Sequence, residues 1–349
     1  MVSPSTSVGR GVVRCGVAAV LFGASAPAAS RIAGDMSPAT LAGLLYLGAA
    51  VAVLPVISRH RSSWASIRRG SGRLAIAVVV GGAIGPVLLA AGLTRTSAAS
   101  ASLLLNLELV FTTMLAGLVF REHLGPRVVR GTLLVVVASV VLGWSGSGDV
   151  RWGAGLIAAA CACWAVDNCV TANLDELAPS HITLVKGVVA GGANLAIGLL
   201  IADAPAGPAV VGALAIGVVG YGMSITLWVA GARDLGAARG QLVFATAPFV
   251  GVIVAWTLFS EPVTAREVSS IAIAAVGVGF VLRSSHTHEH HHGHVEHEHD
   301  HTHDDGHHNH NHSHGEPVVG AHSHRHGHQP ITHVHPHVPD LHHRHGHAA

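Results

Sequence analysis

The chain has 349 residues, of which 50% are hydrophobic and only 11% are charged, and its formal net charge is +1. An ordinary soluble domain carries roughly 25% charged residues, so this composition argues against a soluble protein with a large apolar core. The charge is also uneven. Residues 1–283 contain 18 Lys and Arg against 11 Asp and Glu, whereas residues 284–349 contain 2 against 8.

Ten apolar stretches follow one another along residues 1–283. Each is close to the ~20 residues that a helix needs to cross about 30 Å of hydrocarbon. The stretches are 11–33, 38–57, 74–93, 97–119, 129–145, 153–173, 182–202, 209–231, 236–259 and 265–282. We therefore predict an all-α polytopic membrane protein with about ten transmembrane helices. Pro27, Pro55, Pro86 and Pro248 lie inside predicted spans and should kink them.

Lys and Arg in the short loops predict the orientation, because cytoplasmic loops carry an excess of them. With the N-terminus inside, thirteen arginines lie in cytoplasmic loops: Arg10, Arg14, Arg59, Arg61, Arg68, Arg69, Arg73, Arg121, Arg127, Arg130, Arg233, Arg239 and Arg283. Only Arg31, Arg95, Arg151 and Arg266 lie on the other side. We expect a multi-pass protein of the cell (plasma) membrane, with both the N-terminus and the C-terminal tail in the cytoplasm.

The two halves of the hydrophobic region repeat each other. A shift of 139 residues places 91–143 on 230–282 without gaps, and Val79-Val80-Gly81 falls on Val218-Val219-Gly220. Phe120-x-Glu122 then falls on Phe259-x-Glu261. Each predicted half contains five helices. Because five is an odd number, the second half enters the membrane from the side opposite to the first. Inverted repeats of this kind are typical of secondary transporters, whose substrate site lies near the midplane between the repeats.

Residues 10–283 resemble the EamA family of the drug/metabolite transporter superfamily. The paired segments 103–143 and 242–282 each contain a long helix, an aromatic-x-Glu, a short basic loop and a Gly/Val-rich helix. Leu21–Ser25 and Cys163–Ala165 are similar to that family's aromatic-small opening of each half. The resemblance implies a secondary carrier for a small metabolite, often an exporter. It does not name the substrate.

The predicted domains are 1–10, an N-terminal cytoplasmic segment; 11–145 and 146–283, the two five-helix repeats; and 284–349, the tail. One departure from the family pattern is that Glu108 stands between two leucines where many members carry a proline, whereas the second repeat keeps Pro248.

Ionisable groups inside a bilayer are costly and tend to be functional. Glu108 lies in the middle of the fourth predicted span, and its carboxylate could bind a cation or exchange a proton for substrate; the alternative is a structural hydrogen bond to a neighbouring helix. Asn106 precedes it by two residues, or about 200° around a helix, so the two cannot face one cavity. Thr112, one turn on, shares the face of Glu108.

Asp167 and Asn168 lie in the sixth predicted span and are the next candidates for substrate binding or coupling. We expect Glu108 and Asp167 to share a central cavity. Lys186 opens the seventh span; it could pair with Asp167, although reaching toward the headgroups is the favoured interpretation. Further candidate contacts for substrate are Asn194, Gln241, Tyr221 and Trp228. Glu122 and Glu261 are expected to fix loops or to gate through ion pairs.

Of 29 histidines, 26 lie in 286–347, many as His-x-His. Neutral imidazole binds Ni, Zn, Co and Cu(II). The predicted metal ligands are His286, His288, His290, His291, His292, His294, His297, His299, His301 and His303. The tail has too few apolar residues for a core, so we predict a disordered, labile metal binder. A low-complexity tail without a selected role is the alternative.

No motif for a nucleophile, a nucleotide or a zinc protease is found in a supporting context, so we predict no enzyme, no required cofactor and no nucleic-acid partner. The expected function is a secondary transporter, an exporter of a small metabolite whose tail binds divalent metal. The alternatives are efflux of divalent Ni, Co or Zn, and a membrane-anchored metal store or sensor. Expected partners are the lipid bilayer, the substrate and the metal, and a homodimer is one open alternative for the assembly.

Overall fold

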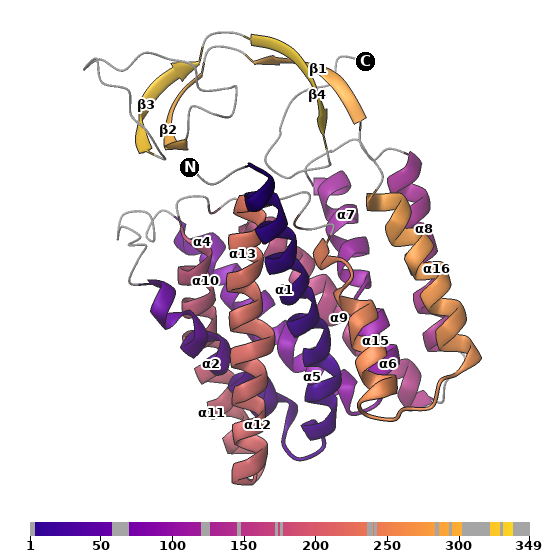
Figure 1. Cartoon of the computed structure of the whole chain (residues 1–349). Helices are drawn as coiled ribbons and strands as arrows, with labels where there is room; N and C mark the ends of the chain where they lie inside the picture. Colours follow the sequence, from indigo (N-terminus) through magenta and orange to yellow (C-terminus); the bar gives the residue numbers. More distant parts are fainter. Residues whose placement is uncertain are drawn as a thin grey trace. The chain divides into compact units, whose positions relative to one another are not determined.

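The computed structural model describes residues 4–57, 70–119, 126–144, 148–171, 174, 177–235, 240, 243–282, 286–292, 295–301, 322–328 and 331–337. The chain divides into two compact units, Met1–Ser284 and Ser285–Ala349, and each is described by itself. The first unit is built of helices (Figure 1). The domain boundaries proposed above stay predictions.

The first half of the helical unit contains α1 (Pro4–Ile32), α2 (Pro38–Ile57), α4 (Ser71–Ile76), the π-helical segment η1 (Ala77–Ile84), α5 (Gly85–Leu93), α6 (Ala98–Leu104), α7 (Leu107–Val119) and α8 (Pro126–Trp144). The second half contains α9 (Gly148–Thr171), α10 (Pro179–Val185), η2 (Lys186–Ala190), α11 (Gly191–Ile201), α12 (Gly207–Ile216), η3 (Gly217–Met223), α13 (Ser224–Leu235), α15 (Ala247–Thr257) and α16 (Ala265–Leu282). Here η2 and η3 are also π-helical.

Seven helical segments in the described residues are long and apolar enough to cross a membrane: Gly9–Ile32, Pro38–Ile57, Ser71–Leu93, Ala98–Leu115, Gly148–Thr171, Pro179–Ile201 and Gly207–Gly231. The described parts of the other three predicted spans are α8, α15 and α16. The prediction of an all-α polytopic membrane protein is confirmed. Several helices begin two to five residues earlier than predicted, for example at Pro126 and Pro179, because proline suits the first helical turn, where its missing N–H is not needed.

Close contacts between small residues hold the helices together. Gly48 of α2 and Gly217 of η3 face each other's helices: a Cβ on Gly48 would lie 2.4 Å from the Leu214 carbonyl oxygen, and one on Gly217 would lie 2.2 Å from that of Leu45. Helices in lipid gain little from hydrophobic burial against each other, so close packing of this kind drives their association.

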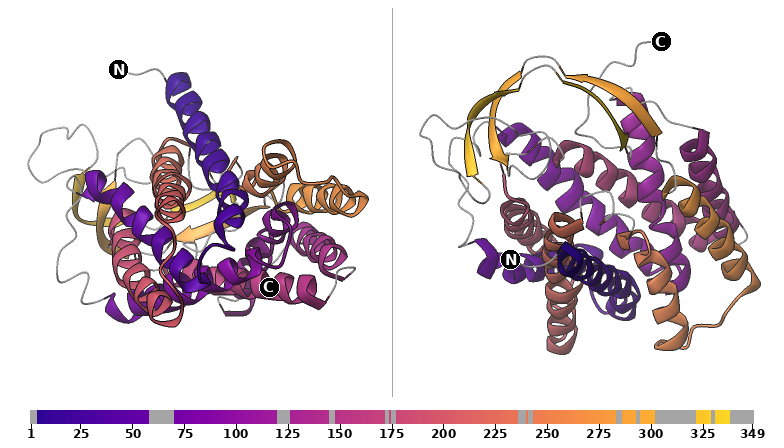
Figure 2. Two further views of the ribbon diagram at one scale, coloured as in Figure 1. Left: turned by 90° about the horizontal axis from the view of Figure 1, so that it is seen from below. Right: turned by 45° about the horizontal axis from the view of Figure 1, so that its top comes forward.

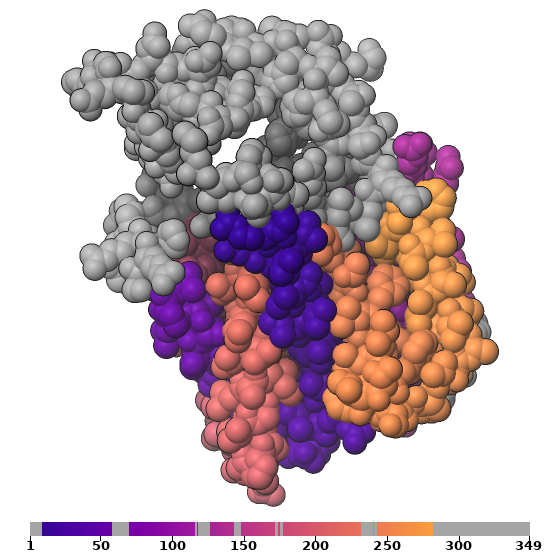
Figure 3. All heavy atoms as spheres, viewed as in Figure 1, coloured from indigo at the N-terminus to yellow at the C-terminus, as the bar shows by residue number. Residues whose placement is uncertain are grey.

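The α8 and α16 pair lies at one edge of the helical body (Figure 2) and meets at Gly131 and Gly277, each of which abuts the other's carbonyl oxygen. On another face, α13, α1 and α15 lie side by side as a continuous surface (Figure 3). Large apolar side chains such as Leu54 and Leu133 remain more than half exposed on the outside of the unit. A surface of this kind suits lipid rather than water.

The prolines predicted to kink spans fall into two groups. Pro27 and Pro55 lie inside continuous helices, α1 and α2. Pro86 and Pro248 instead stand in the first turn of α5 and α15, directly after irregular backbone. These two prolines mark the places where the third and ninth spans depart from α-helix, because proline supplies no N–H for the preceding turn.

In the second unit the described residues form β1 (His286–His292), β2 (Val295–His301), β3 (His322–His328) and β4 (Ile331–His337). β1 pairs with β4 and β2 with β3, both antiparallel, as two separate two-stranded ladders. These ladders are consistent with the prediction of a tail that has no stable core. An isolated two-stranded ladder is at best marginally stable in water, and these strands contain few apolar residues for a core.

Replacing Gly217 with alanine should destabilise the helical unit by about 1–3 kcal/mol, because the new methyl group would displace the carbonyl of Leu45 on α2. Gly192→Ala is the matched control, since a Cβ at Gly192 meets no atom within 4 Å. Thermal unfolding in detergent measures both. Equal melting temperatures for the two variants would contradict this assignment of the α2 contact.

Candidate functional site

The fourth and ninth spans are both interrupted at corresponding places. A turn at 105–106 separates α6 from α7, and a turn at 245–246 precedes α15. The 139-residue shift moves 105–106 to 244–245, one residue from the second interruption. Discontinuous helices at equivalent positions of two repeats are where secondary transporters commonly place their substrate site.

The two interruptions have different causes. Pro248 follows the second one and cannot donate a backbone hydrogen bond. At the first, where no proline stands, the Asn106 side chain takes part: its Nδ2 donates to the Leu103 carbonyl oxygen over 3.1 Å. Asn106 is only 5% exposed and is engaged within its own span. Its amide nitrogen is therefore engaged with the backbone, and a contact of Asn106 with substrate stays a prediction.

Glu108 lies in the first turn of α7, directly after this interruption, where the helix dipole favours a negative charge. Its Oε1 accepts a 2.8 Å hydrogen bond from Nδ2 of Asn168 on α9. This bond joins two of the residues predicted from the sequence. Thr112, predicted to share the face of Glu108, has a buried hydroxyl without a partner among the described residues.

Asp167, the neighbour of Asn168, forms an ion pair with Lys186 at the start of η2. The preference for a Lys186 that reaches toward the headgroups is wrong. Its side chain is 14% exposed, because the first residue of η2 faces α9 rather than the membrane surface. The other carboxylate oxygen, Asp167 Oδ1, is buried and has no hydrogen-bond partner in the described part of the chain.

Gly81 makes room for this ion pair. A Cβ on Gly81 would lie 2.3 Å from the Asp167 Cγ, so η1 can approach α9 only because residue 81 has no side chain. The Gly81 carbonyl oxygen accepts two hydrogen bonds, from Tyr46 Oη over 3.0 Å and from Trp164 Nε1 over 3.1 Å. Both donors are buried, and they hold η1 against α2 and α9.

Aromatic rings continue the site toward the second repeat. Tyr221, in η3, meets Phe22 edge-on with ring centres 5.8 Å apart and lies 6.1 Å from Tyr46. Phe22 in turn lies 5.3 Å from Phe244, which precedes the interruption of the ninth span. The predicted candidate Tyr221 is therefore part of an aromatic cluster that joins α1, α2 and η3.

Sequence reasoning did not name Tyr46, Trp164, Phe22 or Gly81 as site residues, although the motifs that it quoted contain the last three. The repeated triplet Val-Val-Gly lies in η1 and in η3, two of the three π-helical segments. Short π-helical stretches are frequent at functional sites. A repeated glycine in two apolar spans could therefore have pointed to the same place.

The remaining candidates are less central. Asn194 donates from Nδ2 to the Ala83 carbonyl oxygen over 3.1 Å, which ties α11 to η1. Gln241 lies outside the described residues, as do Glu122 and the histidines His294 and His303. The other eight named histidines lie on β1 and β2. No group of three or more His, Cys, Asp or Glu suited to a metal occurs in the part of the chain that was described.

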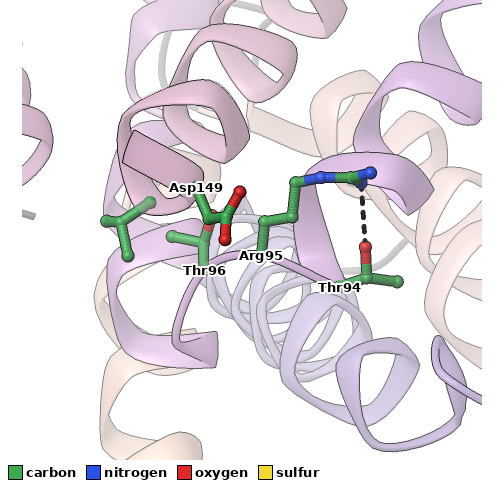
Figure 4. Close-up of a pocket in the computed structure, with 5 residues that line it drawn as sticks. Thr94, Arg95, Thr96 and Asp149 are labelled. Atoms are coloured by element: carbon green, nitrogen blue, oxygen red, sulfur yellow. Dashed lines mark hydrogen bonds between the residues drawn. The ribbon is translucent and has the colours of Figure 1, made fainter. Parts of the chain in front are cut away.

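An open pocket lies elsewhere, at the turn between α5 and α6 and the first turn of α9 (Figure 4). Thr94, Arg95, Thr96, Asp149 and Val150 line it, and Arg95 Nη1 donates to the Thr94 hydroxyl over 3.1 Å. None of these residues takes part in the buried cluster of Glu108, Asp167 and Lys186. The pocket is a surface feature of the connecting segments.

Known proteins resemble this chain in fold and in sequence. A solved structure titled "Crystal structure of protein" superposes with a TM-score of 0.57 at 17% identity, over 80% of this chain and 97% of the other, which shows a shared fold. An "Uncharacterized transporter" from Methanothermobacter thermautotrophicus (strain Delta H) is 28% identical over 287 residues, covering 76% of this chain and 83% of that protein. The model of the EamA-like transporter family matches twice, at residues 10–144 and 151–283. The chain therefore belongs to the EamA-like transporter family.

Proposed function

We propose that this transporter is a secondary carrier that exports a small polar metabolite, and that Asp167, Lys186, Glu108 and Asn168 bind the substrate or its coupling ion. The observation that supports this most directly is Asp167 Oδ1, a buried acceptor without a partner in the described residues. A buried polar atom left unsatisfied costs about 1–3 kcal/mol. A solute that donates a hydrogen bond would remove that cost.

Lys186 can bind the acceptor group of a solute whose donor group binds Asp167. Its ammonium has three N–H groups, and Asp167 is the carboxylate that it contacts. A metabolite with both a donor and an acceptor can bind Asp167 and Lys186 together. The pair is neutral as a whole, so the site suits a polar organic solute better than a bare cation.

Glu108 and Asn168 are proposed for coupling. A carboxylate at the first turn of α7 that is held by an amide can take up a proton or a monovalent cation as substrate leaves. Glu108 of α7 is bonded to Asn168 of α9, and Asp167 is the residue before Asn168. The two carboxylates are therefore held by neighbouring residues of one helix. This supports the proposal that both carboxylates serve one central site.

Divalent metal efflux is the alternative that the tail favours. The body offers it little support: Asp167 is paired with an ammonium group, and the described residues contain no three-ligand cluster. We therefore assign metal binding to the tail, as a labile buffer or sensor, rather than to the transport path. A pure store would not need membrane-spanning helices in this number.

The proposed location is the plasma membrane, with the N-terminus and the tail in the cytoplasm. It rests on the thirteen arginines of the loops on that side against four on the other. A histidine-rich tail placed there would meet cytosolic metal.

The substrate can be found by comparing metabolites inside and outside cells that express the wild type or Asp167→Asn. We expect solutes enriched in the medium of wild-type cells to fall by about tenfold or more, because a charge-assisted hydrogen bond contributes about 1.5–3 kcal/mol and 1.4 kcal/mol is tenfold. Asp149→Asn, on the exposed first turn of the same helix, is the matched control. Export unchanged by Asp167→Asn would refute the assignment.

The ion pair also predicts that a second substitution restores most of the stability lost through the first. Lys186→Met should destabilise the protein by about 3–5 kcal/mol, because it leaves the Asp167 carboxylate buried and unpaired. The double variant Asp167→Asn/Lys186→Met should recover most of this loss, since no unpaired charge remains. Melting temperatures of the four proteins in a double-mutant cycle test it. Additive losses would mean that the two groups do not interact.

Deleting 284–349 should remove most binding of Ni²⁺ and Zn²⁺ by the purified protein. Binding by the full chain should weaken from about pH 7.5 to about pH 5.5, because protons compete with metal for imidazole. Equilibrium dialysis measures both effects. Metal retained by the deletion variant and lost in Glu108→Gln would instead favour metal transport through the body.

A further inference from the structure

The N-terminus of α6 is capped by a residue of the other repeat. The backbone N–H of Ala98 donates to Glu261 Oε1 over 2.8 Å, and that of Ala99 donates to Glu261 Oε2 over 3.0 Å. More than 160 residues separate the partners along the chain. One carboxylate therefore ties the start of the fourth span to the loop that follows the ninth.

This cap completes the hydrogen bonding of the first turn. The next N–H, of Ser100, donates to Ser97 Oγ over 3.1 Å. Ala98 and Ala99 are buried, so water cannot replace Glu261 as the acceptor while this arrangement lasts. A carboxylate also interacts favourably with the positive end of a helix dipole.

A second carboxylate from the same segment reinforces the contact. Glu267, in the first turn of α16, accepts hydrogen bonds at Oε1 from the hydroxyls of Ser97 over 3.1 Å and Ser100 over 3.3 Å. Its Oε2 accepts from the Thr264 backbone N–H over 3.2 Å and from the Thr264 hydroxyl over 3.0 Å. Glu267 is 4% exposed, although its partners are hydroxyl and backbone groups rather than a cation.

The loop between α15 and α16 is held in an unusual shape. Ser260 has a φ of 53°, a left-handed conformation that serine rarely adopts. Beside it, the Arg31 guanidinium of α1 lies 5.4 Å from the centre of the Phe259 ring. Strained backbone persists only where surrounding contacts hold it, and here those contacts come from α1 and α6.

The other end of α6 leads to the candidate site. After Leu104 the span turns at 105–106, and Glu108 follows in α7. The Cys161 thiol of α9, which is fully buried, lies 3.7 Å from the Leu104 carbonyl oxygen. α6 is thus a short rod, held by two carboxylates at one end and interrupted beside the cluster at the other.

We propose that Glu261 and Glu267 form a latch that closes the transport path on the membrane face where α6 begins. While both hold α6, it stays packed against α1, α9 and α15; when they release it, α6 swings about 105–106 and opens the cluster to this face. The sequence pattern suggested loop fixation or gating by ion pairs, whereas the contacts found are to backbone N–H and hydroxyl groups. The inference rests on the transport function of the family and not on the substrate proposed above.

Cys161 can report the opening. In a protein with Cys15, Cys163 and Cys169 changed to serine, Cys161 is labelled with a membrane-impermeant maleimide added at the face that carries Glu261. Glu261→Gln keeps one acceptor and loses the charge and the second acceptor. We expect its labelling rate to rise by about tenfold, the factor that corresponds to 1.4 kcal/mol. Labelling from the opposite face should not rise.

Asp35→Asn is the matched control, because Asp35 is an exposed carboxylate in the loop after α1. An unchanged labelling rate in Glu261→Gln overturns the latch, and so does an equal rise from both faces, which marks general loosening. If Glu261→Gln yields no folded protein, Glu267→Gln leaves the Glu261 bonds in place and should raise the rate in the same direction. No rise in that variant overturns the proposal. The readout needs no substrate, so a failed latch and a failed substrate site give separate results.

Discussion

A buried charge in a low-dielectric interior needs an opposite charge or hydrogen bonds, and the central part of this structure is arranged around one ion pair, Asp167 with Lys186. The pair requires Gly81, since any side chain there would occupy the space of the carboxylate. It also requires that η1 stay close to α9, which Tyr46 and Trp164 secure through the Gly81 carbonyl oxygen. Spans two, three, six and seven are therefore linked through a few polar atoms. Apolar burial alone would not determine how far each helix is shifted along its neighbours.

Polar contacts elsewhere in the body follow the same logic, because backbone groups in lipid must be satisfied within the protein. Asn194 bonds the backbone of η1, and Ser224 Oγ donates to the Ala18 carbonyl oxygen of α1. These bonds lie between glycine contacts that bring the helices close together. Small residues set the distances between spans, and polar side chains at those contacts set their register.

Much of the fold could be predicted from the sequence, because span length, composition and the 139-residue repeat depend on local patterns. Glu108, Asp167 and Asn168 could also be selected, since charge in an apolar span is rare. Partners were harder to predict. Lys186 lies near the beginning of a predicted span, and only the packing of η2 against α2 and η1 decides that it pairs inward with Asp167. In the sequence Tyr46 and Trp164 cannot be told from other aromatic residues of an apolar span. Their role depends on the position of the Gly81 carbonyl oxygen in η1, to which both donate. The bond of Asn106 to the Leu103 carbonyl was not predicted either, because it depends on the turn at 105–106.

The difference between Asn106 and Pro248 makes the two repeats mechanically unequal. Proline lacks an N–H in every conformation, so the ninth span always lacks one backbone hydrogen bond of a regular α-helix at Pro248. The interruption of the fourth span depends on an amide that holds the Leu103 carbonyl, a bond with a net value of about 0.5–1.5 kcal/mol. That is only one to three times the thermal energy. The interruption of the fourth span is therefore held more weakly than that of the ninth, and two halves of one duplicated protein differ in how firmly their fourth and ninth helices are kept interrupted.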